Sequence, residues 1–204
     1  DGQVLTSTGA GSPPAFEALP SSASAIGDLS DAVTTATSNI GLGSTALDSL
    51  SASNGNYNVA VGVNAGTAIT TGDDNIAIGF GALDAITIES DCIAIGSNAL
   101  GDLRHDSAAR NIGIGVGAGD GMGTVYGVDN IFIGYDAGGG TWTTAESNDN
   151  IAIGDYAMDA AMNGALGNIA VGVNGLSSIT TADNCIGIGN GAGQSVTTGG
   201  GNIA

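Results

Sequence analysis

The amino-acid sequence predicts an all-β protein in which short parallel strands stack into a solenoid. A five-residue motif, Asn-(Ile/Val)-small-(Ile/Val/Leu)-Gly, recurs from residue 39 to the end of the chain. Successive copies begin 17 to 20 residues apart, a regular spacing that is typical of coiled repeat architectures. Glycine accounts for 37 of the 204 residues, and the helix formers Lys and Glu are almost missing.

Composition and charge exclude several other classes of protein. The chain carries 20 acidic and 2 basic residues, and a net charge of −18 opposes binding to nucleic acid. A hydrophobic fraction of 42%, with β-branched residues at regular places, opposes intrinsic disorder. No apolar run approaches the ~20 residues of a transmembrane helix, so we expect no membrane insertion.

The chain divides into three parts. Residues 1–24 hold the only three prolines and no repeat, so we expect a connector or attachment segment there. Residues 25–38 lack the motif but have spaced apolar residues, which predicts a capping element for the first coil. Residues 39–204 form the predicted repeat domain of about nine coils. Residues 202–204 match the first three residues of a further motif, so we expect this domain to continue beyond the sequence.

Each motif predicts one strand with two different faces. The Ile-x-Ile alternation places large residues on one face and Ala or Gly on the other. Phe132 is the single large residue on the small face. Several coils contain a second β-prone run, and from these runs we expect a second short strand. The runs are residues 69–71, 86–88, 179–181 and 196–198.

The first residue of each motif is expected to form a ladder whose side chains bond the coils above and below. Two ladder positions are cysteines that lie five coils, or roughly 24 Å, apart, far beyond disulfide reach. We therefore expect two free thiols that act as small ladder residues. The ladder residues are Asn39, Asn58, Asn75, Cys92, Asn111, Asn130, Asn150, Asn168, Cys185 and Asn202.

The glycine that closes each motif is expected to form a backbone turn that a Cβ atom would obstruct. These turn glycines are Gly43, Gly62, Gly79, Gly96, Gly115, Gly134, Gly154, Gly172 and Gly189.

The two apolar strand faces together predict self-association. Only one face of each strand can point into a coil, so the other face needs a cover from outside. Copies of the same chain are the simplest cover, and a homotrimer around the long axis is the simplest arrangement.

The repeat resembles two known families. The pattern NIAIG-x-x-AL, followed by TTG and the next Asn, is similar to the head repeats of trimeric autotransporter adhesins, which form left-handed parallel β-rolls. It is closer to the NTAIG-type repeats of tailed-bacteriophage fibres. The resemblance covers about residues 39–204, although the coils here are longer than those of the adhesin heads. Residues 1–9 and 13–19 look like a segment common in phage tail fibres.

This resemblance implies a left-handed β-roll trimer that serves as a structural fibre or spike segment of a phage virion. The implied partners are other copies of the chain, other fibre or tail proteins through the N-terminal segment, and a host-surface glycan or protein. The alternative is a trimeric adhesin head or extracellular filament at a cell surface.

Cofactor and metal motifs are weak in this chain. Residues 113–118 and 187–192 match G-x-G-x-x-A, but a dinucleotide site needs that pattern inside a βαβ unit. The GGxGxD nonapeptide of calcium-binding β-rolls is missing from the sequence. We expect no cofactor and no dedicated metal site. Adventitious cation binding at the loop pairs Asp73-Asp74 and Asp129-Asn130 stays open.

The sequence does not predict an enzyme. His105 is the only histidine, the chain has no lysine, and nothing in the pattern orders His105 beside a nucleophile. Paired carboxylates could support glycoside hydrolysis, but 20 acidic residues will produce suitable pairs by chance.

Three consecutive long coils, residues 92–110, 111–129 and 130–149, predict a lateral binding patch. Stacked insertions emerge on the same side of a solenoid, and aromatic, Arg and His side chains suit sugar or protein contacts. The alternative is that these residues cover a wider core or touch a neighbouring chain. The patch residues are Arg104, His105, Arg110, Tyr126 and Trp142.

Overall fold

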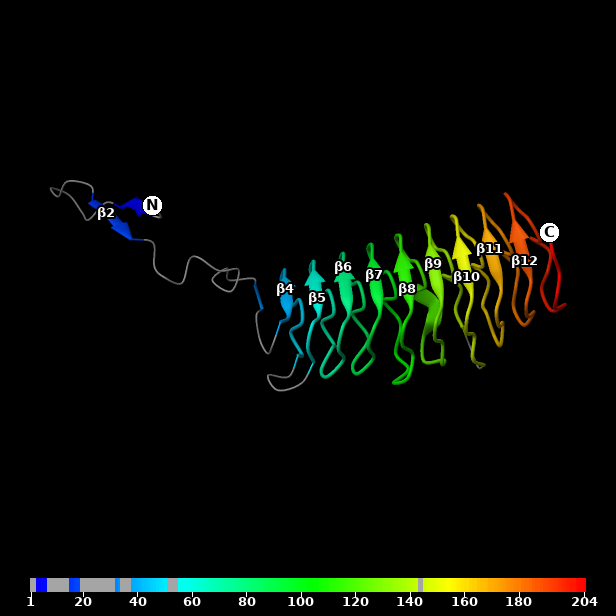
Figure 1. Ribbon diagram of the computed structural model, residues 1–204, viewed down its shortest axis with the longest axis horizontal. Coiled ribbons are helices and arrows are strands. Elements are labelled where there is room, and N and C mark those ends of the chain that lie inside the picture. Colours follow the sequence, from blue (N-terminus) through cyan, green and yellow to red (C-terminus); the bar gives the residue numbers. More distant parts are fainter. Residues whose placement is uncertain (1–2, 7–14, 19–31, 34–37, 51–54, 143–144) are drawn as a thin grey trace.

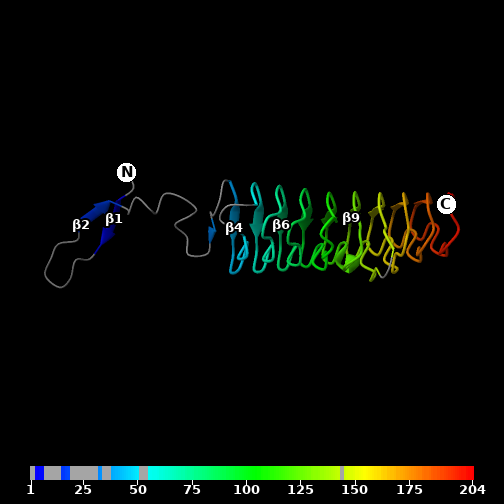
Figure 2. The same ribbon diagram turned by 90° about the horizontal axis from the view of Figure 1, so that it is seen from below.

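The repeat region folds into a straight rod in which each coil lies directly beside the next (Figures 1 and 2). The computed structural model of the chain describes residues 3–6, 15–18, 32–33, 38–50, 55–142 and 145–204, with side chains described from residue 38 onward. Nine parallel strands, one from each motif, form a solenoid of about eight turns, which confirms the predicted fold class. Apart from one 3-10 turn, η3 (Asp120–Met122), the described residues contain no helix.

The parallel strands are three residues long and pair in exact register through the central Ile-x-Ile segment of each motif. They are β4 (Ile40–Leu42), β5 (Val59–Val61), β6 (Ile76–Ile78), β7 (Ile93–Ile95), β8 (Ile112–Ile114), β9 (Ile131–Ile133), β10 (Ile151–Ile153), β11 (Ile169–Val171) and β12 (Ile186–Ile188).

Three more strands lie in the N-terminal part of the chain. Strands β1 (Gln3–Thr6) and β2 (Ala15–Ala18) pair antiparallel within the predicted connector. Strand β3 (Ala32–Val33), within the predicted cap, pairs antiparallel with β4. An antiparallel strand occupies the free edge of β4, so the parallel stack ends there. The remaining residues of the connector and cap, apart from Ser38, lie outside the described residues.

The small face of each strand points into the coil. Ala77 and Ala94, the middle residues of β6 and β7, are at most 1% exposed, and the isoleucines on either side of them are not buried. The interior opposite them is filled by Leu, Met and Ile from the loop that follows each strand. The largest of these fully buried residues are Leu47, Ile69, Leu83, Ile86, Leu100, Leu103, Met122, Met158, Met162, Leu176 and Ile179.

Phe132 fits on the small face because the facing loops carry glycine. A Cβ atom on Gly138 would lie 2.4 Å from the Phe132 ring, and one on Gly119 would lie 2.9 Å from it. On the preceding strand the small residue is Gly113, which leaves room for the large side chain of Leu100. Large and small residues therefore alternate across a thin core so that its volume stays nearly constant.

The prediction of a second strand in each coil is wrong. The amides of Thr70 and Thr71 both donate to the carbonyl of Thr87, at 2.8 and 3.2 Å, and the Thr70 hydroxyl donates to the same oxygen at 3.0 Å. Three donors therefore converge on one acceptor, whereas a parallel ladder needs evenly spaced bonds. Thr180 and Thr181 converge on Thr197 in the same way. The buried Ile69 and Ile179 explain the β-like pattern of these runs, since they are core anchors.

The ladder asparagines form a buried hydrogen-bond column along the rod. The Asn58 Oδ1 atom accepts the backbone amide of Asn75 at 3.0 Å, and Asn75 Oδ1 accepts the amide of Cys92 at 3.0 Å. Asn75 Nδ2 donates to the Glu89 carbonyl of its own coil at 2.8 Å. Each amide therefore ties its coil to the next and closes its own loop. The same two bonds form at Asn39, Asn58, Asn111, Asn130, Asn150 and Asn168.

The two cysteines occupy ladder positions as buried free thiols. Their sulfur atoms lie where the Asn Nδ2 atoms lie in other coils, 3.8 Å from the Ala108 carbonyl for Cys92 and 3.2 Å from the Gly199 carbonyl for Cys185. Burial raises the pKa of the Cys92 thiol to about 11, so the reactive thiolate is suppressed at neutral pH.

The turn glycines form a second column. Gly134 has a φ of 137°, and a Cβ atom there would lie 2.6 Å from the carbonyl carbon and oxygen of Gly154 in the next coil. Coils spaced by one strand separation leave no room for a side chain at this corner.

Replacing Asn130 with Ala should lower the free energy of unfolding by about 2–4 kcal/mol, because the Asn150 amide and the Ser147 carbonyl lose their partners in a buried site. Thermal or denaturant unfolding followed by circular dichroism measures this loss. The control is Asn190→Ala at an exposed position. Equal losses in the two variants would contradict the ladder's role.

Gly134→Ala should destabilise the fold by about 2 kcal/mol more than Gly189→Ala. Both residues have the same backbone conformation, with φ of 137° and 131°, so both variants share its conformational penalty. Only the first variant adds a clash with the next coil, because a Cβ atom on Gly189 meets nothing closer than Ala192 at 3.9 Å. Melting temperatures measured side by side test this, and equal shifts would rule out the stacking clash.

Candidate functional site

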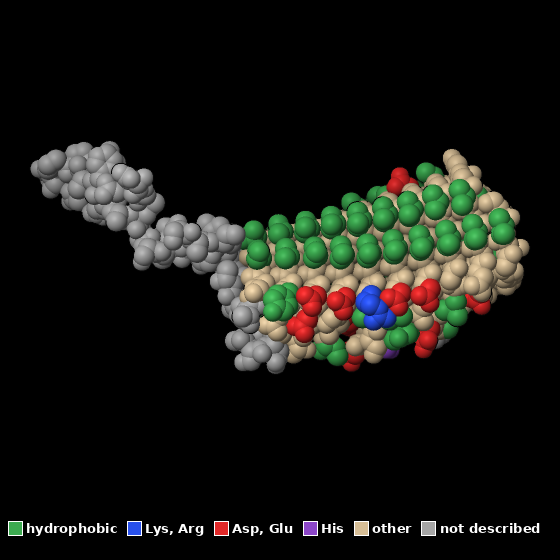
Figure 3. Space-filling view, viewed as in Figure 1, with side chains coloured by type: hydrophobic (Ala, Val, Ile, Leu, Met, Phe, Trp, Pro, Cys, Tyr) green, Lys and Arg blue, Asp and Glu red, His purple; other side chains and the backbone are tan. Residues whose placement is uncertain are grey.

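The most extensive exposed feature of the rod is an apolar face made by the outward side chains of β4 to β12. Figure 3 shows these side chains as two continuous rows along the rod. Ile78, Ile95 and Ile153 are each 38% exposed. One row is Ile40, Val59, Ile76, Ile93, Ile112, Ile131, Ile151, Ile169 and Ile186. The other is Leu42, Val61, Ile78, Ile95, Ile114, Ile133, Ile153, Val171 and Ile188.

The apolar face is as large as the largest apolar patches that monomeric surfaces expose. Nine strands at ~4.8 Å spacing extend about 43 Å, and two rows of side chains are about 13 Å wide, which gives about 560 Å². Contiguous apolar patches of several hundred Å² typically mark interaction sites. The apolar face is therefore the leading candidate for an interaction surface.

An acidic rim runs along one side of the apolar face. It consists of the residue before each ladder position from Asn58 to Cys185, and the amide of each member donates to the carbonyl of the residue just before the preceding member, as from Asp91 N–H to Asp73 C=O at 3.1 Å. Figure 3 shows acidic side chains, interrupted by an arginine, in a row parallel to the apolar rows. Arg110 pairs with Asp129 through two bonds of 2.6 and 2.8 Å. The acidic rim is Tyr57, Asp74, Asp91, Arg110, Asp129, Asp149, Gly167 and Asn184.

A neutral rim flanks the opposite ends of the strands. It consists of the residue after each turn glycine, and its coils are linked by bonds such as Tyr156 N–H to Tyr135 C=O at 2.9 Å. Phe80 is 57% exposed, and Tyr135 packs edge-to-face on Tyr156 with a centroid distance of 5.3 Å. The neutral rim is Ser44, Val63, Phe80, Ser97, Val116, Tyr135, Asp155, Val173 and Asn190, with Asp155 as its one charged member.

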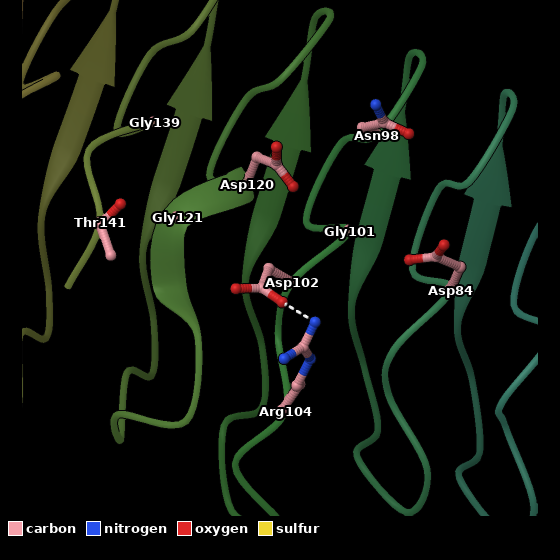
Figure 4. A pocket seen from close by; sticks show the side chains of 9 residues that line it. All are labelled: Asp84, Asn98, Gly101, Asp102, Arg104, Asp120, Gly121, Gly139 and Thr141. Atoms are coloured by element: carbon pink, nitrogen blue, oxygen red, sulfur yellow. Dashed lines mark ion pairs between the residues drawn. The ribbon is translucent and has the colours of Figure 1, made fainter. Parts of the chain in front are cut away.

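A groove of about 410 Å³ lies on another part of the coil perimeter. Asp84, Asp102 and Asp120 enter it from three successive coils, and Asp102 forms an ion pair with Arg104 (Figure 4). Burial raises the pKa of Asp84 and of Asp120 above the ordinary range, and neighbouring carboxylates add to the shift at Asp120. The groove is lined by Asp84, Asn98, Gly101, Asp102, Arg104, Asp120, Gly121, Gly139 and Thr141.

Sequence reasoning missed this groove, although a signal for it existed. Asp84 and Asp120 both lie nine residues after a ladder residue, as do Asp48 and Asp159. Residues at one repeat position stack on one side of a solenoid, so this recurrence indicates an acidic row.

The structure separates the residues of the predicted lateral patch. His105 and Tyr126 pack edge-to-face with a centroid distance of 5.4 Å. Arg110 lies on the acidic rim with its charge close to Tyr126, and Arg104 lies in the groove. Trp142 is only 3% exposed and packs against Phe132 with a centroid distance of 6.0 Å. Trp142 is therefore a core residue that fills the widest coils, and it does not join a surface patch.

Within the described ranges, no group of three or more His, Cys, Asp or Glu side chains is arranged to hold a metal ion. His105 Nδ1 accepts a hydrogen bond from the Ser107 amide at 3.2 Å. The glycines of residues 113–118 and 187–192 belong to strands β8 and β12 and the turns that follow them.

None of the helical structure in the described part of the chain is long and apolar enough to span a membrane. Comparison with protein-family models, with curated proteins and with solved structures finds no significant match to this chain. The functional argument therefore depends on the geometry of the rod itself.

The Asp120→Asn variant should melt a few degrees higher than the wild type at neutral pH, and the difference should disappear as the pH falls below 4. A raised carboxyl pKa means that the folded state disfavours the charged form, so ionisation lowers stability as the pH rises. Thermal melts between pH 3.5 and 7 measure this. Asp106→Asn, at an exposed position outside the groove, is the control. A constant difference across this pH range would contradict an electrostatic origin.

Proposed function

We propose that this chain is a structural segment of an extracellular fibre, in which copies of the rod associate through the apolar face into a homotrimer. The apolar face is the observation that carries the proposal. Apart from Leu42, its side chains are β-branched, and all are held in register by the strands, so they offer a preformed surface that loses little side-chain entropy on association.

The rest of the rod suits a load-bearing, surface-exposed element. Every coil is tied to its neighbours by strand pairing, and each ladder asparagine adds a buried bond to the next coil, so bending would break bonds in a dry interior. A net charge of −18 on each chain keeps the assembled fibre soluble and opposes side-by-side clumping.

Within this proposal the fibre belongs to a tailed-phage virion and contributes to attachment to the host surface. The repeat pattern and the N-terminal residues 1–19 support this assignment by resemblance. The N-terminal segment would join other fibre or tail proteins. Several copies on one rod would let weak contacts with a host glycan or protein add up through avidity.

The native protein should scatter light as a particle of three times the 19.5 kDa chain mass. A double variant, Ile78→Asp with Ile153→Asp, should weaken assembly at least ~100-fold and yield single chains, because carboxylates cannot be buried unpaired in the interface. Size-exclusion chromatography with light scattering measures both.

The matched control is Ile88→Asp, since Ile88 is 46% exposed but lies outside the apolar face. Circular dichroism would verify that each variant keeps its fold. A wild-type protein at the single-chain mass over a wide concentration range would refute the proposal, as would equal dissociation of the Ile88→Asp control.

A further inference from the structure

The groove on the perimeter of the rod follows a two-coil alternation of large and small residues. Nine residues after the ladder position, the coils between residues 75 and 167 carry aspartate and glycine in turn. Residues at one repeat position stack on one side of a solenoid, so each of these glycines lies between two aspartates. Successive carboxylates are therefore two coils apart, which is about 10 Å. This first column is Asp84, Gly101, Asp120, Gly139 and Asp159.

A second column alternates in the opposite sense. Six residues after the ladder position, a polar side chain is present where the first column has glycine, and glycine is present where the first column has aspartate. A Cβ atom on Gly81 would lie 2.6 Å from Asn98 Oδ1, and one on Gly117 would lie 2.2 Å from Asp136 Oδ1. Each polar side chain therefore occupies space that a glycine of the neighbouring coil leaves empty.

The glycines of the first column keep the groove open. A Cβ atom on Gly101 would lie 3.1 Å from Asp120 Oδ1, and both residues line the groove, so a larger side chain at Gly101 would enter it. Every described residue of the lining is glycine or polar. The lining offers carboxylate acceptors together with the donors of Arg104, Asn98 and Thr141 (Figure 4).

An exposed pair of tyrosines lies where the groove meets the next coil, residues 150–167. Tyr156 belongs to the second column, one coil beyond Asp136, and is 41% exposed. It packs edge-to-face on Tyr135, which is 47% exposed, with a centroid distance of 5.3 Å. Asp136 interacts electrostatically with both Tyr156 and Asp120 of the groove, so the aromatic pair and the groove are neighbours.

These features together fit one chemical class of ligand. The aspartates repel an anion, and a cation has no acceptor to offer the donors of the lining. The hydroxyl groups of a neutral saccharide both donate and accept along its whole length. A sugar ring also has a face of C–H groups that packs on an aromatic ring. The two-coil separation of the carboxylates corresponds to the length of an extended disaccharide.

We infer that the groove binds an extended neutral oligosaccharide, which lies along the rod with one disaccharide for every two coils and one sugar ring packed on Tyr156. This inference rests on the proposed function, in which the rod contacts a host surface, and it adds the site and the ligand class. The column from Asp84 to Asp159 extends over four coil separations, about 19 Å, so it accommodates two disaccharide units.

Saturation-transfer nuclear magnetic resonance on the full chain tests this with three sets of oligosaccharides. The neutral set contains gluco-, manno-, galacto- and N-acetylated chito-oligosaccharides, the basic set deacetylated chito-oligosaccharides, and the acidic set oligogalacturonates. An open, shallow groove should bind a member of the neutral set with a Kd of about 1 mM at each site. The affinity should rise from the disaccharide to the tetrasaccharide and then level off. Because the ligand is uncharged, added salt should leave the affinity unchanged.

Two variants place the ligand in the groove. Tyr156→Ala and Asp84→Ala should each weaken binding of the neutral oligosaccharide about tenfold, because one removes the aromatic platform and the other a hydrogen-bond acceptor. The matched controls are Tyr57→Ala, a tyrosine that is 60% exposed on the acidic rim, and Asp48→Ala, at the repeat position of Asp84 but outside the groove. Both controls should bind as the wild type does, and circular dichroism verifies that each variant is folded.

Three results would overturn the inference: no neutral oligosaccharide binds, the control variants lose as much affinity as the groove variants, or the basic set binds more tightly and salt abolishes its binding. Light scattering on the same samples separates this inference from the proposed function. A trimer that binds no neutral oligosaccharide would overturn the inference alone. A single chain that binds one through Tyr156 and Asp84 would overturn the proposed homotrimer and leave the groove assignment intact.

Discussion

The rod depends on stacking its coils at the separation of one parallel strand. That spacing is maintained by strand pairing outside and by the asparagine ladder inside, where each side-chain amide accepts a bond from the next coil and donates one within its own. A buried amide that loses either partner is costly, so the ladder fixes the rise and the register at each coil that carries a ladder asparagine. The positions of all other residues follow from these two quantities.

A fixed rise restricts the residues that can occupy each position of the repeat. At every turn glycine except Gly189 the next coil is so close that a Cβ atom would overlap its backbone, so these positions accept glycine alone. Inside the coil, two opposed layers share a narrow space, and one layer can be large only where the other is small. Two pairs of residues show this limit on volume: Phe132 lies opposite Gly138, and Leu100 lies opposite Gly113. Variation in the core is therefore paired across the coil.

The repeat period was sufficient to predict the parallel solenoid, because nine recurrences of one strand motif allow few other arrangements. The repeat period could not predict which strand face points inward, because both faces are apolar. The width of the coil decides which of the two faces fits inside it. The β-prone runs around Ile69 and Ile179 misled the prediction because β-branched anchors and strand residues have the same pattern. Trp142 was predicted to lie on the surface because its coil is one of the longest. The length of the coil did not show that the added residues widen the core.

The narrow coil also explains why an interaction surface exists at all. A wide solenoid could bury its isoleucines and expose its alanines, but here only Ala, Gly and a single Phe fit on the inner face. The larger β-branched side chains are therefore forced outward on every strand, and the apolar face is a consequence of the repeat length. No residue of that face lines the acidic groove. Copies joined through the face would accordingly leave the groove, with Arg104 and its three aspartates, outside the contact between copies.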